Sequence, residues 1–218
     1  MATDGTEVSG RGDVAERIAR QTFANRGPDY PGEVRRLLDA GREVMRACGT
    51  TSRPRVADIV AAAGLSNDAF YRHFASKDAL VQAILEDGTE RLHSYLHHQM
   101  DKEPTPEAKV RCWVDGVLDQ AADPELAAST LAVLWNAGSV GQGMVARPPR
   151  ATAPLAVLLR EPFAALGSAD PDLDAELVTH AVVGLLADHL WRDERPTPAA
   201  VEHATRFCLA AIGAADRS

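Results

Sequence analysis

Cysteine is scarce in this sequence, and long apolar runs are absent. Three of the 218 residues are cysteines (Cys48, Cys112 and Cys208), and they are widely spaced within apolar helical patterns. An odd number of such positions argues against a disulfide framework, and no CxxC or Cys/His ligand spacing typical of a zinc site occurs. We therefore expect buried, reduced thiols.

No apolar stretch approaches the roughly 18 residues that a membrane-spanning helix requires. The first ten residues, MATDGTEVSG, are polar and lack the hydrophobic region of a signal peptide. A soluble cytoplasmic protein is expected.

Signatures of common enzymes are also missing. The sequence contains no phosphate loop, HExxH motif, nucleophile elbow or dinucleotide fingerprint, and no carboxylate pair stands out. The Gly-rich stretch 138–149 is not followed by Gly-Lys-Ser/Thr, so a mobile loop is expected there. His93 and His97 have the i,i+4 spacing of two metal ligands, but no third ligand is evident. We expect no catalytic residue, cofactor or metal.

The residues that are abundant point to helices. Hydrophobic residues make up 45% of the chain, Ala, Leu and Val dominate, and strand-like alternation is rare. Periodicity and breakers predict an all-α fold with helices over 33–48, two short helices within 56–74, and helices over 76–99, 108–121, 124–135, 155–166 (kinked or split at Pro162), 173–191 and 199–212.

The stretch Val56–Phe74 predicts a helix-turn-helix. Gly64 marks the turn, Ser66 is a good N-cap, and Phe70 and Phe74 are an i,i+4 pair that faces inward. The second helix then exposes Asn67, Tyr71 and Arg72. Such a helix, with polar and cationic groups on its outer face, has the shape that enters a DNA major groove.

The charge distribution favours the same interpretation. The chain carries a net charge of −8, but residues 33–78 hold eight Lys/Arg and six Asp/Glu, a local balance of +2. Because DNA affinity depends on the local patch, the acidic total does not exclude a nucleic-acid partner.

Four segments resemble the TetR family of transcriptional regulators: VADI at 56–59, AAGLS at 62–66, FYRHF at 70–74 and SKDAL at 76–80. The resemblance covers about residues 33–96. It implies a flexible N-terminal arm (1–32), a three-helix DNA-binding domain (33–78) and a C-terminal helical bundle for ligand binding and dimerisation (79–218).

The resemblance also implies roles for single residues. Arg55 and Val56 would approach phosphates, Asn67 and Ala69 would face bases, and Tyr71 and Lys77 would bind phosphate. With neighbours chosen from the local pattern, the predicted DNA-contacting set is Arg53, Arg55, Val56, Ser66, Asn67, Ala69, Tyr71, Arg72 and Lys77. Asp68 and Ala69 depart from the family pattern, which leaves the operator sequence open.

In the C-terminal part, large aromatic and polar residues within the apolar stripes are the candidates for a ligand pocket: Trp113, Trp135, Phe163, His180 and His189. The helices at 172–191 and 198–213 are apolar over more than one face, so we expect them to pair with a second subunit.

The sequence therefore predicts a ligand-responsive DNA-binding transcriptional regulator, a repressor that binds a palindromic operator as a dimer and is released by a small molecule. Two alternatives remain open. One is a helical interaction protein that has lost DNA binding, which Asp68 and the net charge of −8 support. The other is a small helical enzyme.

Overall fold

The structure is a computed structural model that describes residues 30–140 and 152–213, and every regular element in these ranges is helical. The expectations for the arm at 1–29 and for 141–149 lie outside these ranges. In chain order the elements are α2 (Tyr30–Cys48), α3 (Val56–Ala63), α4 (Asn67–His73), α5 (Lys77–Met100), α6 (Pro106–Leu118), the short 3-10 helix η1 (Asp119–Ala121), α7 (Pro124–Val140), α8 (Ala153–Ala165), α9 (Pro171–Arg192) and α10 (Pro198–Gly213).

The all-α prediction is confirmed, and the helix bounds differ from those expected by up to five residues. α2 begins at Tyr30, because Pro31 in a first helical turn has no intrahelical N–H bond to lose. α7 continues through 138–140, where a loop was expected. α8 is not split at Pro162, which is buried inside the helix together with Leu159 and Phe163. Packing of this apolar stripe outweighs the local penalty of the proline.

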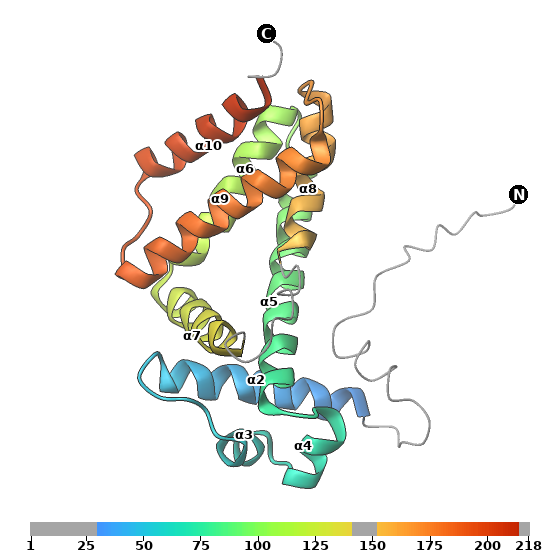
Figure 1. Ribbon diagram of the computed structural model, residues 1–218, viewed down its shortest axis with the longest axis vertical. Coiled ribbons are helices and arrows are strands. Elements are labelled where there is room, and N and C mark those ends of the chain that lie inside the picture. Colours follow the sequence, from blue (N-terminus) through green and yellow to red (C-terminus); the bar gives the residue numbers. More distant parts are fainter. Residues whose placement is uncertain (1–29, 141–151, 214–218) are drawn as a thin grey trace, which may run out of the picture.

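The helix α5 connects the two ends of the molecule. Figure 1 shows α2, α3 and α4 at one end, α6, α8 and α10 toward the other, and α5 running between them. Its 24 residues span about 36 Å at 1.5 Å per residue. At its start, the Ser76 hydroxyl accepts a hydrogen bond from the backbone N–H of Ala79 (3.1 Å), which confirms the predicted cap.

Two hydrophobic clusters form the core. The N-terminal cluster joins α2, α3 and α4 with the first half of α5 and includes Val133 of α7. The C-terminal cluster joins the second half of α5 with α6, α8, α9 and α10. Side chains on both sides of the expected boundary at 78/79, such as Phe70 and Ile84, therefore share one cluster.

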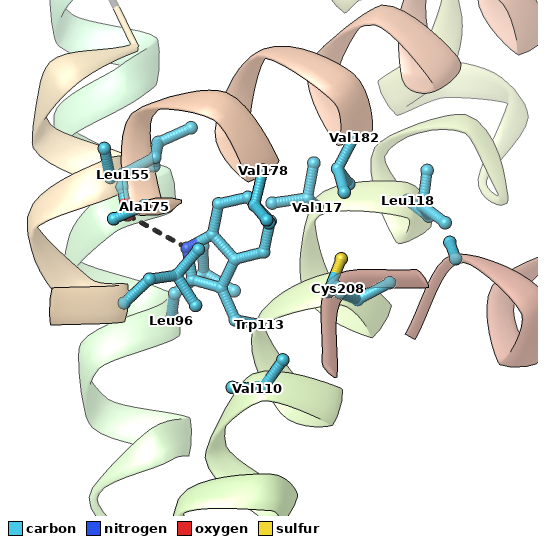
Figure 2. Close-up of a cluster of buried hydrophobic side chains, with 14 of the residues drawn as sticks. Leu96, Val110, Trp113, Val117, Leu118, Leu155, Ala175, Val178, Val182 and Cys208 are labelled. Carbon is cyan, nitrogen blue, oxygen red and sulfur yellow. Dashed lines mark hydrogen bonds between the residues drawn. The ribbon is translucent and has the colours of Figure 1, made fainter. Parts of the chain in front are cut away.

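Trp113 lies at the centre of the C-terminal cluster. Its indole Nε1–H donates a hydrogen bond to the backbone oxygen of Leu155 (3.0 Å), so the one polar atom of this buried ring has a partner. Figure 2 shows Val178 and Val117 beside the ring and Leu96 on the neighbouring helix. This packing fixes α6 against α8 and α9.

Candidate nucleic-acid interface and internal cavity

A tight turn at Gly64 joins α3 to α4. Gly64 has φ 65° and ψ 34°, a left-handed conformation that glycine adopts without a steric cost. The N–H of Leu65 donates to the carbonyl of Val60 (2.9 Å), which satisfies an end carbonyl of α3. The Ser66 Oγ then accepts from the N–H of Ala69 (3.1 Å) and begins α4. The predicted helix-turn-helix is therefore present with its predicted N-cap.

The inner face of α4 is fixed by aromatic packing. Phe70 and Phe74 are buried at 0% and 3% exposure, and their ring centroids lie 5.8 Å apart. Behind them, the buried His73 donates through Nε2 to the Glu33 carboxylate of α2 (2.6 Å). This hydrogen bond is the largest cause that lowers the pKa of Glu33, and the nearby Arg72 acts in the same direction.

The outer face of α4 presents Asn67, Asp68, Tyr71 and Arg72, all exposed. Tyr71 keeps 59% of its surface exposed although its ring edge contacts Phe70 at 5.2 Å between centroids. The helix that carries Tyr71, α4, lies at the end of the molecule shown below α2 in Figure 1.

Arg53 and Arg55 precede α3, and both are exposed. Arg55 does not cap the helix with its side chain; it forms an ion pair with Asp58, with 2.9 Å from Nε to Oδ2. Val56, the first residue of α3, is half-buried, and so is Lys77, the first residue of α5. In Figure 1, α3 and the start of α5 lie at the same end of the molecule as α4.

Ala69 differs from the other members of the predicted DNA-contacting set because its side chain is buried. It is buried, with 2% exposure, on the side of α4 that faces the protein. A base edge cannot reach a buried methyl group, which corrects the expectation that Ala69 reads bases. The expectation came from its position in the family motif, and burial is decided by how α4 packs.

A cavity of about 420 Å³ lies between the two hydrophobic clusters. Ile84, Leu85 and Val133 of the N-terminal cluster line one part, and Val117 and Leu186 of the C-terminal cluster line another. The other lining residues are Arg42, Gly88, Thr89, Arg91, Leu92, Tyr95, Gln120, Leu126, Ser129, Thr130, Leu134, Thr152, Leu155 and Val183.

None of the five predicted ligand-binding residues lines this cavity. Trp113 and Phe163 are fully buried within the C-terminal cluster. Trp135 and His189 are half-buried, and His180 is exposed on α9. The large aromatic rings fill the core, because a ring that packs on all sides buries more apolar area than one that borders a cavity.

Sequence reasoning missed an ion cluster beside the cavity. Asp87 of α5 is buried, with its side chain 4% exposed. Its Oδ2 accepts a hydrogen bond from Arg42 of α2 (2.7 Å) and forms an ion pair with Arg91 (2.7 Å). Arg42 also pairs with Asp39 at 3.0 Å. The sequence pattern could have identified Asp87 as a buried acid. Asp87 lies three residues after the buried Ile84, at a position where the helical period predicts a core residue.

Residues 37–84 match the family described as "Bacterial regulatory proteins, tetR family". No curated protein sequence matches the chain. Within the described ranges, none of the helices combines the length and apolarity needed to cross a bilayer.

Solved structures share the fold. The fatty acid degradation regulator FadR of Bacillus halodurans is 18% identical with a TM-score of 0.61, covering 85% of this chain and 96% of FadR. A transcriptional regulator of Pseudomonas aeruginosa PAO1 is 21% identical with a TM-score of 0.62, covering 89% and 94%. FadR of Bacillus subtilis, solved in complex with stearoyl-CoA, is 13% identical with a TM-score of 0.60, covering 82% and 98%.

Proposed function

We propose that this protein, in which residues 37–84 match the tetR family of bacterial regulatory proteins, is a cytoplasmic, ligand-responsive transcriptional repressor of that family. It binds a palindromic operator as a homodimer and is released by a small molecule. The observation that carries the proposal is the helix-turn-helix, whose second helix is held by buried phenylalanines and exposes polar side chains.

In the proposed DNA complex, α4 enters the major groove. Asn67, exposed in the first turn of α4, reads a base, because an Asn amide can both donate to and accept from an adenine edge. Tyr71, Lys77 and Arg53 contact phosphates and set the register. Arg55 joins them with the guanidinium nitrogens that its pair with Asp58 leaves available.

The other residues of the predicted DNA-contacting set contribute less to the proposed complex. Arg72 serves as a further cation beside the groove, although its pair with Glu33 at 3.4 Å holds it toward α2. Val56 and Ser66 act through the backbone at the starts of α3 and α4, where helix N-termini attract phosphate. Ala69 is left out because it is buried.

The proposed dimer forms through α9 and α10. Leu173, Leu177 and Trp191 of α9 are 51%, 58% and 55% exposed, and Phe207 of α10 is 53% exposed. Leu173 and Leu177 lie on one face of α9 at i,i+4 spacing, and the exposed Gly184 follows two helical turns later on the same face. A second copy that covers these side chains would remove their apolar surface from water. The two α4 helices would then reach grooves about 34 to 36 Å apart.

The cavity is the proposed effector site. Its volume of about 420 Å³ lies in the range of small-molecule sites, and its walls are mostly apolar with a few polar groups. Because the walls include members of both hydrophobic clusters, a ligand that fits one arrangement of the clusters better than another would shift the DNA-binding end.

DNA binding is tested by fluorescence anisotropy on the DNA upstream of the gene that encodes the chain, at several salt concentrations. Lys77→Ala should weaken binding and reduce the slope of log K against log salt by about one. Lys102→Ala, at the opposite end of α5, is the matched control and should leave both unchanged. No salt-dependent binding by the parent to any upstream fragment, with a folded protein, would favour the interaction-protein alternative.

The dimer is tested by light scattering on the purified chain. The parent should have about twice the 23.3 kDa chain mass. Leu177→Glu should shift the mass toward the monomer, because it places charge in the proposed contact, whereas Val157→Glu on the exposed surface of α8 should not. A monomeric parent at micromolar concentration contradicts the dimer.

A further inference from the structure

The charged groups in the cavity wall are all of one sign. Within the described ranges, the charged side chains that line the cavity are Arg42 and Arg91, and no carboxylate is among the lining residues. The part of the wall formed by Leu155, Val183 and Leu186 of α8 and α9 is apolar. The cavity therefore has a cationic side at α2 and α5 and an apolar side at α8 and α9.

The two arginines differ in how many of their terminal nitrogens form ion pairs with acids. Arg42 is engaged through both terminal nitrogens, one with Asp39 at 3.0 Å and one with Asp87 at 2.7 Å. The ion pairs that Arg91 makes within the described residues all involve one terminal nitrogen, Nη2, at 2.7 Å from Asp87 and 3.7 Å from Asp39. Since a guanidinium carries five N–H donors in a planar fork, Arg91 has donors left for a further anion.

The surroundings would strengthen such an interaction. Arg42 has a side-chain exposure of 22% and Asp87 of 4%, so this side of the cavity is partly shielded from water at Arg42, whereas Arg91 is 51% exposed. A cationic ligand group would meet two arginines there. A neutral ligand group would lack the charge-assisted hydrogen bonds that an anion makes with a guanidinium.

We propose that the cavity binds an amphipathic carboxylate, with the carboxylate on Arg91 and Arg42 and the apolar body against α8 and α9. The regulatory consequence rests on the proposed function, in which this cavity is the effector site. The binding claim itself needs only the cavity.

Binding would act on the contact between α2 and α5. The ligand carboxylate competes with Asp87 and Asp39 for the two arginines, and Arg42 belongs to α2, which packs on the helix-turn-helix. Next to Arg42, a Cβ atom built on Gly41 would lie 2.7 Å from Cδ1 of Ile84, which also lines the cavity. Because α2 and α5 pack this closely, a rearrangement of the cavity wall requires the two helices to move relative to each other.

The experiment measures binding of dodecanoate and of dodecanol, below their aggregation concentrations, to the purified full chain by calorimetry. The two probes share the apolar chain and differ in the charge of the head group. Dodecanoate should bind at least tenfold more tightly than dodecanol. Val183→Trp, which fills the apolar side of the cavity, should abolish binding of both.

Three arginine variants test the cationic side. Arg91→Gln should weaken dodecanoate binding about tenfold, in line with one lost charge-assisted hydrogen bond, and leave dodecanol unchanged. Arg91→Lys should restore most of the affinity because it restores the charge. Arg160→Gln is the matched control, since Arg160 is 48% exposed, pairs with Asp172 and lies outside the cavity. Circular dichroism checks that each variant is folded.

Equal or tighter binding of dodecanol, or no binding of either probe, overturns the proposed ligand class. Dodecanoate binding that Val183→Trp does not affect places the ligand elsewhere and also overturns it. Operator binding is measured separately by anisotropy with and without dodecanoate. Tight dodecanoate binding in a chain that never binds DNA contradicts the proposed function and leaves this inference standing.

Discussion

Replacing Asp87 by Ala removes the centre of the ion cluster between α2 and α5. The Oδ2 atom of Asp87 accepts a hydrogen bond from Arg42 (2.7 Å) and forms an ion pair with Arg91 (2.7 Å). The side chain is 4% exposed, so the carboxylate is held by these partners and not by water. The variant leaves both guanidinium groups without their shared acceptor.

The size of the effect follows from what each arginine retains. A hydrogen bond to a charged group contributes about 1.5 to 3 kcal/mol. Arg91 is 51% exposed and can be solvated by water, and Arg42 keeps its ion pair with Asp39. The free energy lost at each arginine is therefore smaller than the full value of its interaction with Asp87. We expect Asp87→Ala to lower the free energy of unfolding by about 2 to 3 kcal/mol. For a chain of this size, the melting temperature should fall by about 4 to 12 °C.

Asp39→Ala is the matched control, because it removes the other acid that pairs with the same two arginines. Asp39 is 53% exposed, and an exposed ion pair contributes at most about 1 kcal/mol. Urea unfolding followed by circular dichroism, at one fixed protein concentration, compares the two variants with the parent. If Asp87→Ala costs no more than Asp39→Ala, the reasoning from burial is refuted.

Three further predictions concern the helix-turn-helix and a buried thiol. Ser66→Ala removes the cap on the N–H of Ala69 and should lower the free energy of unfolding by about 1 kcal/mol, measured by urea unfolding. The hydrogen bond from His73 lowers the pKa of Glu33 below its ordinary 4.5, so its stabilisation is present above pH 4.5 and is lost as the pH falls through the lowered value. Glu33→Gln should therefore be less stable than the parent at pH 6, with a difference that shrinks toward pH 3; a constant difference in acid melts would contradict this. Burial raises the pKa of Cys208 to about 11, so its thiol should react with a disulfide reagent at pH 8 only after unfolding, as residue-resolved mass spectrometry can follow.

The helix-turn-helix was predictable because its determinants are local. The turn needs a residue that tolerates positive φ, the second helix needs a cap, and Phe70 and Phe74 lie one helical turn apart. Each of these requirements is met by residues within a dozen positions of one another, so a linear pattern contains them. The same holds for the cap of α5 at Ser76.

Local patterns failed where packing between distant helices decided the outcome. Pro162 should interrupt a helix in isolation, but α8 continues because it is held against α9. Ala69 occupies a motif position expected to face DNA, but α4 is rotated so that its methyl group is buried. The aromatic residues Trp113 and Phe163, chosen as pocket walls, fill the C-terminal cluster.

Periodicity within each helix thus determined the all-α architecture and the inward position of Phe70 and Phe74, since both follow from residues close together in the chain. Only the tertiary structure decided where the cavity lies and that Arg42, Asp87 and Arg91 meet beside it. Arg42 and Asp87 are 45 positions apart, and their contact depends on the angle at which α2 crosses α5. That angle is set by close packing at Gly41 and Ile84, a property of two surfaces together and of neither helix by itself.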